Sequence, residues 1–265
     1  MELKAQRKVE MKLNEVLYSL SKRGLNFALY QFPQQGRSHL IIDIQQQEKE
    51  KGFVFAPFDH SQDQYFIGAD EHIEFLGETL PIVRVAEGSE KDCKQALDAG
   101  AGGVIVPKIE SASQLEYVRD ISRWPPEGIR GVGYSRANLF GEFFEKYRKE
   151  ALSPILIAMI ESKKGLENLD EILKVRGLDA ILIGPYDLSA SMGITGDFDN
   201  VLFQDIMQKV LAKSVSNNVP VGIHVVEPSF EELDKRIGQG FRFLPFSIDS
   251  VMLRSFSKDI RRRNN

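Results

Sequence analysis

From residue 80 onward, short apolar runs alternate with segments in which apolar residues recur at helical spacing. The runs at 155–160 and 180–183 are almost wholly apolar, which is typical of strands buried on both faces of a parallel sheet. Comparable runs are centred on Ile82, Val104, Ile155, Ile181, Val221 and Phe243. The alternation predicts an α/β fold in which six strands are joined by helical returns.

The first 78 residues follow a different pattern. Apolar residues recur at helical spacing between residues 9 and 23, and Gly24 is a natural stop, which predicts one amphipathic helix. Four strand-like runs follow, NFALYQF, HLIIDI, GFVFAPF and QYFIGA. The links between them are too short to hold crossover helices, which predicts antiparallel hairpins. We therefore divide the chain into a helical and antiparallel, strand-rich leader at 1–78 and a βα-rich domain at 79–265.

Two carboxylates follow neighbouring strands of this predicted sheet. Glu161 comes directly after the run 155–160, and Asp187 comes shortly after the run 180–183. Parallel α/β proteins carry their active sites at the carboxyl ends of the strands, so both side chains are expected at that edge. Paired carboxylates suit a magnesium-like cation that keeps several waters. The alternative is that Glu161 caps the next helix and Asp187 is the N-cap of residues 188–190.

Arg84 ends its strand and brings a guanidinium to the same edge. Its planar fork is suited to a carboxylate or to an oxygen that gains negative charge, although it could instead pair with Glu161 or Asp187. Gly184 precedes Asp187 and would let backbone amides approach a small anion closely; otherwise it forms an ordinary tight turn.

Composition and charge narrow the class of protein. The chain has 265 residues and a net charge of −4, with charges of both signs mixed along it, so no nucleic-acid groove or membrane surface is expected. A single cysteine, Cys93, excludes an internal disulfide and indicates a reducing compartment. The start lacks the apolar core of a signal peptide, and no run is long enough to span a bilayer. We expect a cytoplasmic protein.

The motifs around these residues are similar to those of a known family. Glu161 in IAMIES, Asp187 in IGPYDLSAS and Arg84 in LPIVRVAEG resemble the HpcH/HpaI aldolases, metal-dependent pyruvate aldolases of the pyruvate/phosphoenolpyruvate barrel superfamily. The resemblance covers residues 80–254 and implies a TIM-type (β/α) barrel. Six regular βα units are two short of the eight in such a barrel, so the leader is either an unrelated fusion or the source of the missing strands. Residues 24–75 faintly resemble the amino-terminal part of isochorismate synthase-type enzymes.

The resemblance implies a class II aldolase, a carbon–carbon lyase that reversibly cleaves a 4-hydroxy-2-oxo acid to pyruvate and an aldehyde. Glu161 and Asp187 would hold the metal, Mg²⁺ or Mn²⁺ with Co²⁺ as a further option. Arg84 would be catalytic, and the substrate would contact Arg84, Gly184, Pro185 and Asp187. Family members are oligomers, so we expect a homo-oligomer that packs through the last helix.

The sequence offers two candidates for the general base, and each has an objection. His72, in GADEHIEF, echoes the base motif of the family, but only eight residues separate it from Pro81, too few for a crossover helix. His224 is either a satisfied core histidine or a proton shuttle. Arg130 and Arg136, in GIRGVGYSRA, are expected in a loop over the same edge, where they either meet the distal part of an acidic substrate or stay solvated.

Two other functions remain open. The related citrate-lyase-type proteins act on coenzyme A esters, which would require a basic nucleotide-binding surface that the sequence does not clearly offer. A degenerate barrel that keeps the metal pair but lacks the base would serve as a binding or assembly module. Met159 and Tyr186 bear on substrate identity, since the family commonly has a glutamine at the first position and a small residue at the second.

Overall fold

The computed structural model describes residues 28–30, 82–248, 251–252 and 254–255. Its centre is a five-stranded, all-parallel sheet in the order β2-β3-β4-β5-β6. The strands of this sheet are β2 (Ile82–Arg84), β3 (Gly103–Val106), β4 (Ile155–Ile160), β5 (Ala180–Ile183) and β6 (Val221–Ile223). Their sequential order, with a helical return between neighbours, is that of repeated βαβ units.

β7 (Pro245–Ile248) belongs to a second, two-stranded sheet, which isolated parallel bridges link to the first, from Gly222 to Phe243 and from Val225 to Phe246. The apolar run around Phe243 was predicted as a strand, and the regular strand begins two residues further on. β7 in turn pairs with β1 (Ala28–Tyr30). The strands from β2 to β7 therefore lie where the apolar runs predict them.

The pairing of β1 is one that the leader pattern did not predict. β1 pairs in parallel with the last strand, Ala28 opposite Pro245, while the run expected to form an antiparallel hairpin with NFALYQF lies outside the described residues. A parallel pair needs a long crossover, and here the whole βα-rich part of the chain supplies it. The helix expected at 9–23 and the other three runs of the leader lie outside the described residues, so the division of the chain at residue 78 stays a prediction.

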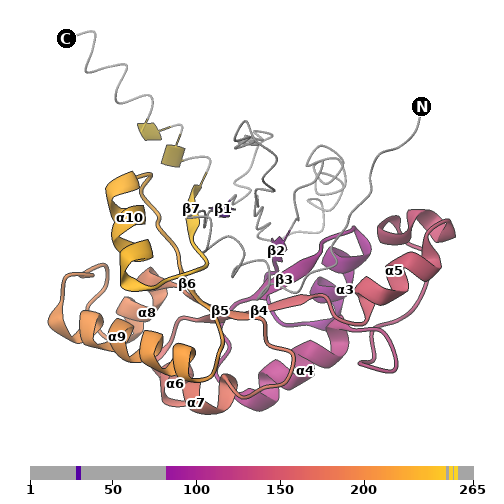
Figure 1. Ribbon diagram of the computed structural model, residues 1–265, viewed down its shortest axis with the longest axis horizontal. Coiled ribbons are helices and arrows are strands. Elements are labelled where there is room, and N and C mark those ends of the chain that lie inside the picture. The colour runs from indigo at the N-terminus through magenta and orange to yellow at the C-terminus, as the bar shows by residue number, and fades with distance from the viewer. Residues whose placement is uncertain (1–27, 31–81, 249–250, 253, 256–265) are drawn as a thin grey trace, which may run out of the picture.

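Helices cover one side of the sheet and form an arc around it (Figure 1). They are α3 (Glu90–Asp98), α4 (Ala112–Ser122), the 3-10 helix η2 (Arg136–Gly141), α5 (Phe144–Ala151), α6 (Lys163–Glu167), α7 (Leu169–Ile172), α8 (Pro185–Ser191), α9 (Val201–Ser216) and α10 (Phe230–Gln239). The helical pattern predicted after Glu161 is divided into α6 and α7 at Asn168, which ends the first helix and begins the second.

Side chains of each strand alternate between two hydrophobic clusters, because successive residues of a strand point to opposite faces. One cluster joins the sheet to the helices and contains Val83, Val104, Leu156, Ile181 and Val221. The other fills the inner face and contains Ile82, Ile105, Ile157, Met159, Leu182 and Phe243. Burial on both faces explains why the strands read as continuous apolar runs.

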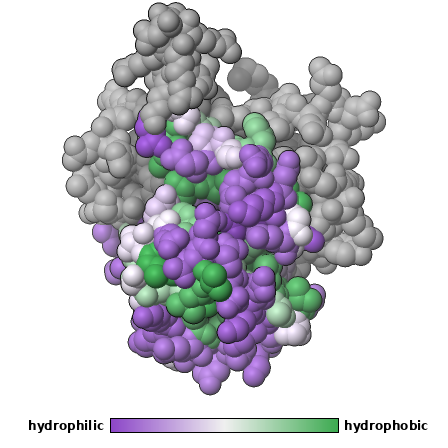
Figure 2. All heavy atoms as spheres, turned by 90° about the vertical axis from the view of Figure 1, so that its left-hand side faces the viewer, coloured by the Kyte–Doolittle hydropathy of each residue, from purple (hydrophilic) through white to green (hydrophobic). Residues whose placement is uncertain are grey.

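The outer surface is mainly hydrophilic over the helical side, with smaller hydrophobic patches between the polar groups (Figure 2). Among the described residues, no helix combines the length and the hydropathy needed to cross a membrane. Cys93 is fully buried, on the packed face of α3.

Candidate active site

Polar groups gather on the inner face at the carboxyl ends of the strands. Alternation places Glu161 on the same face as Ile157 and Met159, Gly184 on that of Leu182, and Arg84 on that of Ile82. The apolar inner cluster lies toward the amino ends of the strands, so these groups follow it at the carboxyl edge. This is the edge at which parallel α/β proteins place their active sites.

Glu161 is a buried carboxylate with one satisfied oxygen. Its side chain is 4% exposed, and its Oε1 accepts a hydrogen bond of 2.8 Å from the backbone N–H of Lys108. The other oxygen, Oε2, is buried and has no hydrogen-bond partner in the described structure. A buried acceptor left without a partner is costly, so Oε2 is a ready ligand for a cation.

Burial raises the pKa of Glu161, while the N–H of Lys108 and the positive charge of Arg84 lower it and the negative charge of Asp187 raises it further. Arg84 and Asp187 therefore lie within electrostatic range of the same carboxyl group. The structure thus brings together the three charged residues that the sequence predicts for the site.

Neither carboxylate is an N-cap, which was the alternative role considered for the pair. Ser162 caps α6, and its side chain accepts from the backbone N–H of Gly165. Gly184 caps α8, and Asp187 lies in the first turn of that helix, exposed to solvent. Pro185 occupies the first helical turn and is buried, as suits a residue that lacks a backbone N–H.

Gly184 is required by the close approach of Glu161. A Cβ at this position would lie 2.8 Å from Glu161 Oε2 and 2.8 Å from Met159 Cε. Any larger residue would push the carboxylate or the Met159 methyl group out of place. Met159, which is 8% exposed, therefore forms the apolar wall beside the unsatisfied oxygen.

The donor set fits a hard divalent cation. Two carboxylates are the usual protein contribution to a magnesium site, in which waters or substrate oxygens complete the shell. Within the described part of the chain, no group of three or more His, Cys, Asp or Glu side chains is placed to hold a metal. A cation held by Glu161 and Asp187 would therefore have coordination positions free for water or substrate oxygens.

His224 is an inner-face residue that the sequence left with two interpretations. It follows β6 with the parity of Gly222, and its Nε2 lies 3.2 Å from the carbonyl oxygen of Ser247. Burial lowers the pKa of His224 to about 4, against the opposing effect of the Ser247 hydrogen bond, so the ring is neutral at neutral pH. The other three histidines, His39, His60 and His72, lie outside the described residues.

Arg130 and Arg136 were expected over the same edge, and the structure places them elsewhere. Arg130 is 1% exposed and packs against Trp124 and Tyr147, and we call these three residues the Arg130 cluster. Its Nη2 donates a hydrogen bond of 2.9 Å to Tyr147 Oη. Its guanidinium carbon lies 5.7 Å from the centroid of the Trp124 ring and 5.8 Å from that of Tyr147. Arg136 Nη1 donates to the carbonyl of Ala99, just beyond the end of α3, at the amino edge of the sheet. Neither is placed to meet a substrate at the carboxyl edge.

The contribution of Lys108 was missed, because it is made by the backbone. Lys108 has a positive φ of 52°, a conformation that a lysine adopts rarely. Nothing in the residue type signals it, whereas the inner-face parity of His224 could have been read from the alternation in VGIHVV.

Comparison with known proteins identifies related sequences and folds. A family model described as HpcH/HpaI aldolase/citrate lyase matches residues 66–255. The chain is 36% identical over 182 residues to a hydroxypyruvate/pyruvate aldolase of Roseobacter denitrificans, covering 68% of this chain and 70% of that protein. It is 35% identical over 175 residues to a 2-keto-3-deoxy-L-rhamnonate aldolase of Klebsiella pneumoniae, covering 65% of this chain and 64% of that enzyme, just under two thirds of its length.

Solved structures agree on the fold. An HpcH/HpaI aldolase/citrate lyase family protein from Burkholderia cenocepacia superposes with a TM-score of 0.72 at 23% identity, covering 95% of this chain and 91% of that one. Macrophomate synthase superposes with a TM-score of 0.73 at 20% identity, covering 98% and 94% of the two chains. At these identities the likeness concerns the fold alone.

Proposed function

The chain belongs to the HpcH/HpaI aldolase/citrate lyase family, and we propose that it is a metal-dependent aldolase that reversibly cleaves a 4-hydroxy-2-oxo acid to pyruvate and an aldehyde. Two relatives that are 36% and 35% identical to this chain over the aligned residues are aldolases that carry pyruvate or a 2-keto acid in their names. The protein is accordingly an enzyme that acts on a small-molecule substrate.

The observation that carries this proposal is the position of Glu161. Its Oε2 is buried without a hydrogen-bond partner in the described structure, at the carboxyl edge of the sheet, within electrostatic range of Asp187 and Arg84. A purely structural carboxylate in this position would be expected to have both oxygens satisfied or a cationic partner of its own. An unsatisfied oxygen beside a second carboxylate supports a cation site.

Each residue has a distinct task in the proposed reaction. Glu161 and Asp187 would hold a divalent metal such as Mg²⁺ or Mn²⁺, since the family generally depends on divalent metals; when bound, the metal would supply Lewis-acid polarisation of the 2-oxo group. Arg84 presents its guanidinium to the ketone oxygen, on which negative charge develops as the bond between C3 and C4 breaks. Gly184 and Pro185 shape the turn that receives the substrate carboxylate.

The cleavage also requires a base that takes the proton of the 4-hydroxyl group. The candidates from the sequence are His72, which lies outside the described residues, and His224, which is neutral at neutral pH and stands on the inner face.

The pairing of β1 with β7 supports the alternative in which strands of the leader complete the barrel. We propose on this basis that the leader is a source of the strands missing from the barrel, with β1 as one of them. We also propose that the chain forms a homo-oligomer that packs through its last helix.

A synthesis assay tests the proposed activity. The full chain is incubated with Mg²⁺ or Mn²⁺, pyruvate and a panel of aldehydes, and the 4-hydroxy-2-oxo acid product is detected by chromatography and mass. Product that disappears when the metal is removed with a chelator supports the aldolase. Turnover of acyl-CoA esters alone would indicate the citrate-lyase type, and metal binding without any turnover would indicate a binding module.

A further inference from the structure

We propose that the backbone N–H of Lys108, fixed by the side chain of Gln114, positions Glu161 for the metal, which makes Lys108 and Gln114 positioning residues of the site. This inference rests on the proposed function, because it assigns a task to residues around the proposed metal ligand.

The first step of the argument is the conformation of Lys108. Its φ of 52° lies in the left-handed region, which costs a residue other than glycine about 1 kcal/mol or more. The turn directs two successive N–H groups toward the end of β4: Lys108 N–H donates to Glu161 Oε1 at 2.8 Å, and Ile109 N–H donates to the carbonyl of Met159 at 3.1 Å. The first of these N–H groups holds the carboxylate, and the second ties the turn to the backbone of β4.

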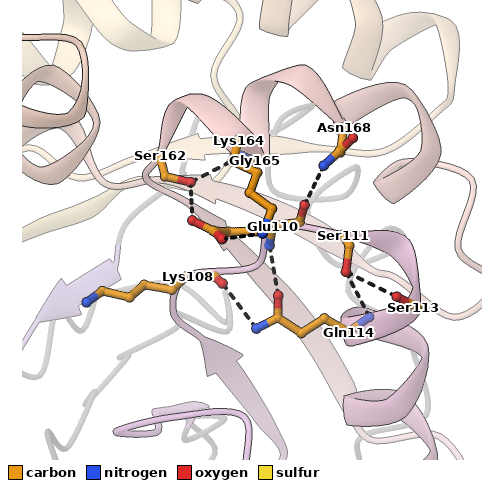
Figure 3. Close-up of polar contacts among 9 residues, drawn as sticks. All are labelled: Lys108, Glu110, Ser111, Ser113, Gln114, Ser162, Lys164, Gly165 and Asn168. Carbon is orange, nitrogen blue, oxygen red and sulfur yellow. Dashed lines mark hydrogen bonds and ion pairs between the residues drawn. The ribbon is translucent and has the colours of Figure 1, made fainter.

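Gln114 holds that turn from both sides (Figure 3). Its Nε2 donates to the carbonyl of Lys108 at 3.1 Å, and its Oε1 accepts from the backbone N–H of Glu110 at 2.9 Å. One side chain in the first turn of α4 is thus hydrogen-bonded to the residues on either side of Ile109. The two bonds need a donor and an acceptor on the same group, which an amide supplies and a carboxylate does not.

Glu110 connects this turn to the segment that carries Glu161 (Figure 3). Ser162 Oγ donates to Glu110 Oε1 at 2.8 Å, and Asn168 Nδ2 donates to the Glu110 carbonyl at 2.7 Å. Lys164 Nζ lies 3.2 Å from Glu110 Oε2, and as a largely exposed pair it contributes little. The loop after β3 and the loop after β4 are therefore held as one unit.

The consequence concerns the orientation of the Glu161 carboxylate. With Oε1 held by Lys108 N–H, the group cannot rotate freely, and Oε2 is the oxygen left for a cation. Hydrogen bonds of this kind around metal ligands typically change metal affinity by about tenfold to a hundredfold when they are lost.

A matched pair of variants at one position isolates the backbone contribution. Lys108→Asn and Lys108→Val both remove the lysine charge, but asparagine tolerates the left-handed region and valine, which is β-branched, does not. We measure the Mn²⁺ dissociation constant by electron paramagnetic resonance titration and the unfolding temperature without metal. Lys108→Val is expected to bind Mn²⁺ about tenfold to a hundredfold more weakly than Lys108→Asn.

A substitution at Gln114 tests the same role independently, in case Lys108→Val does not fold. Gln114→Glu keeps an acceptor for Glu110 N–H but loses the donor to the Lys108 carbonyl, and we expect Mn²⁺ binding to weaken about tenfold. Ser113→Ala is the control, since Ser113 lies exposed one residue away and contacts only Ser111 Oγ among the hydrogen bonds of this region. Its Mn²⁺ affinity should equal that of the wild type.

The outcomes separate this inference from the proposed function. If the wild type binds Mn²⁺ and Lys108→Val or Gln114→Glu loses only thermal stability, with an unchanged dissociation constant, the positioning role is overturned and the aldolase proposal stands. If the wild type binds no Mn²⁺ at all, both are overturned. Selective loss of affinity in Lys108→Val and Gln114→Glu, with binding retained in Lys108→Asn, supports the inference.

Discussion

Two regions of the molecule each bury a charged side chain, and they differ in the groups that surround it. Glu161 lies at the carboxyl edge of the sheet, with an unsatisfied oxygen and the charges of Arg84 and Asp187 nearby. Arg130 lies among the aromatic rings of Trp124 and Tyr147, where its Nε and Nη1 have no hydrogen-bond partner among the described residues. Burial and unsatisfied polar atoms are therefore common to both.

The difference lies in what surrounds each charge. Beside Glu161 stands an exposed carboxylate, Asp187, so the edge is open to a soluble ion. Arg130 is covered by rings that are 2% and 5% exposed, and Tyr147 passes its own hydroxyl hydrogen on to the Leu97 carbonyl at 3.2 Å. A buried charge indicates a functional site only where further ligands converge on it and solvent reaches it.

The largest effect is expected from Glu161→Gln. The amide keeps the shape of the side chain and removes the negative charge that holds the cation, so kcat/KM for aldol cleavage should fall by about 10³-fold or more. The unfolding temperature of the metal-free protein should stay the same or rise, because a buried carboxylate whose pKa is raised by burial no longer has to be desolvated. Steady-state kinetics and thermal unfolding measure the two quantities.

Glu116→Gln is the matched control for that substitution. Glu116 is exposed on α4, so its loss should alter neither activity nor stability. A Glu161→Gln variant that retained wild-type turnover would remove the functional side of the comparison and leave two structural charges.

The next effect concerns Arg130 and separates packing from charge. Arg130→Ala leaves a cavity between Trp124 and Tyr147 and should lower the free energy of unfolding by about 3 kcal/mol. Arg130→Met fills most of the same space without an unsatisfied charge and should change it by less than about 1 kcal/mol. Urea unfolding measures both variants, and kcat/KM should be unchanged in the methionine variant. A large loss of activity in Arg130→Met at full stability would place this region with the active site.

His224 lies on the inner face of the sheet, and its lowered pKa should make the stability of the protein depend on pH. Its pKa is lowered to about 4 in the folded protein from a usual 6.5, so the unfolded chain binds the proton more readily between these values. The stabilisation is complete above pH 6.5 and is lost as the pH falls to 4, by no more than about 3 kcal/mol. The free energy of unfolding of His224→Gln, measured in the same pH range, should lack this part of the slope. An identical slope in both proteins would contradict the assignment of a neutral ring in the folded protein.

Part of this comparison could be predicted from the sequence. Glu161 and Arg84 follow apolar runs, and the geometry of parallel strands then sends both to one edge whatever the loops do. Asp187 was placed correctly at that edge, although its position in the first turn of α8 depends on Pro185 and Gly184. Such predictions succeed because they rest on strand periodicity, which is local.

The rest depends on tertiary contacts that no local pattern contains. Arg130 stands between glycines in GIRGVG, which is typical of an exposed loop, yet Trp124 and Tyr147 from other segments enclose it. The hydrogen bond from Lys108 to Glu161 joins residues 53 positions apart through a backbone group. The parallel pairing of β1 with β7 joins segments more than 200 residues apart, and no local pattern in the sequence indicates it.

The smallest effect is expected at Cys93, and it sharpens the comparison because a cation beside a thiol is also how reactive cysteines are built. Arg130 lies within electrostatic range of Cys93, but burial dominates and raises the pKa of the thiol to about 11. The native protein should therefore show no reaction with a thiol-disulfide reagent at pH 8, while the unfolded chain should release one equivalent, since Cys93 is the single cysteine. Arg130→Met should behave in the same way. Fast labelling of the native wild type that is lost in Arg130→Met would mean that the arginine activates an accessible thiolate, and the Arg130 cluster would then be a second site open to solvent.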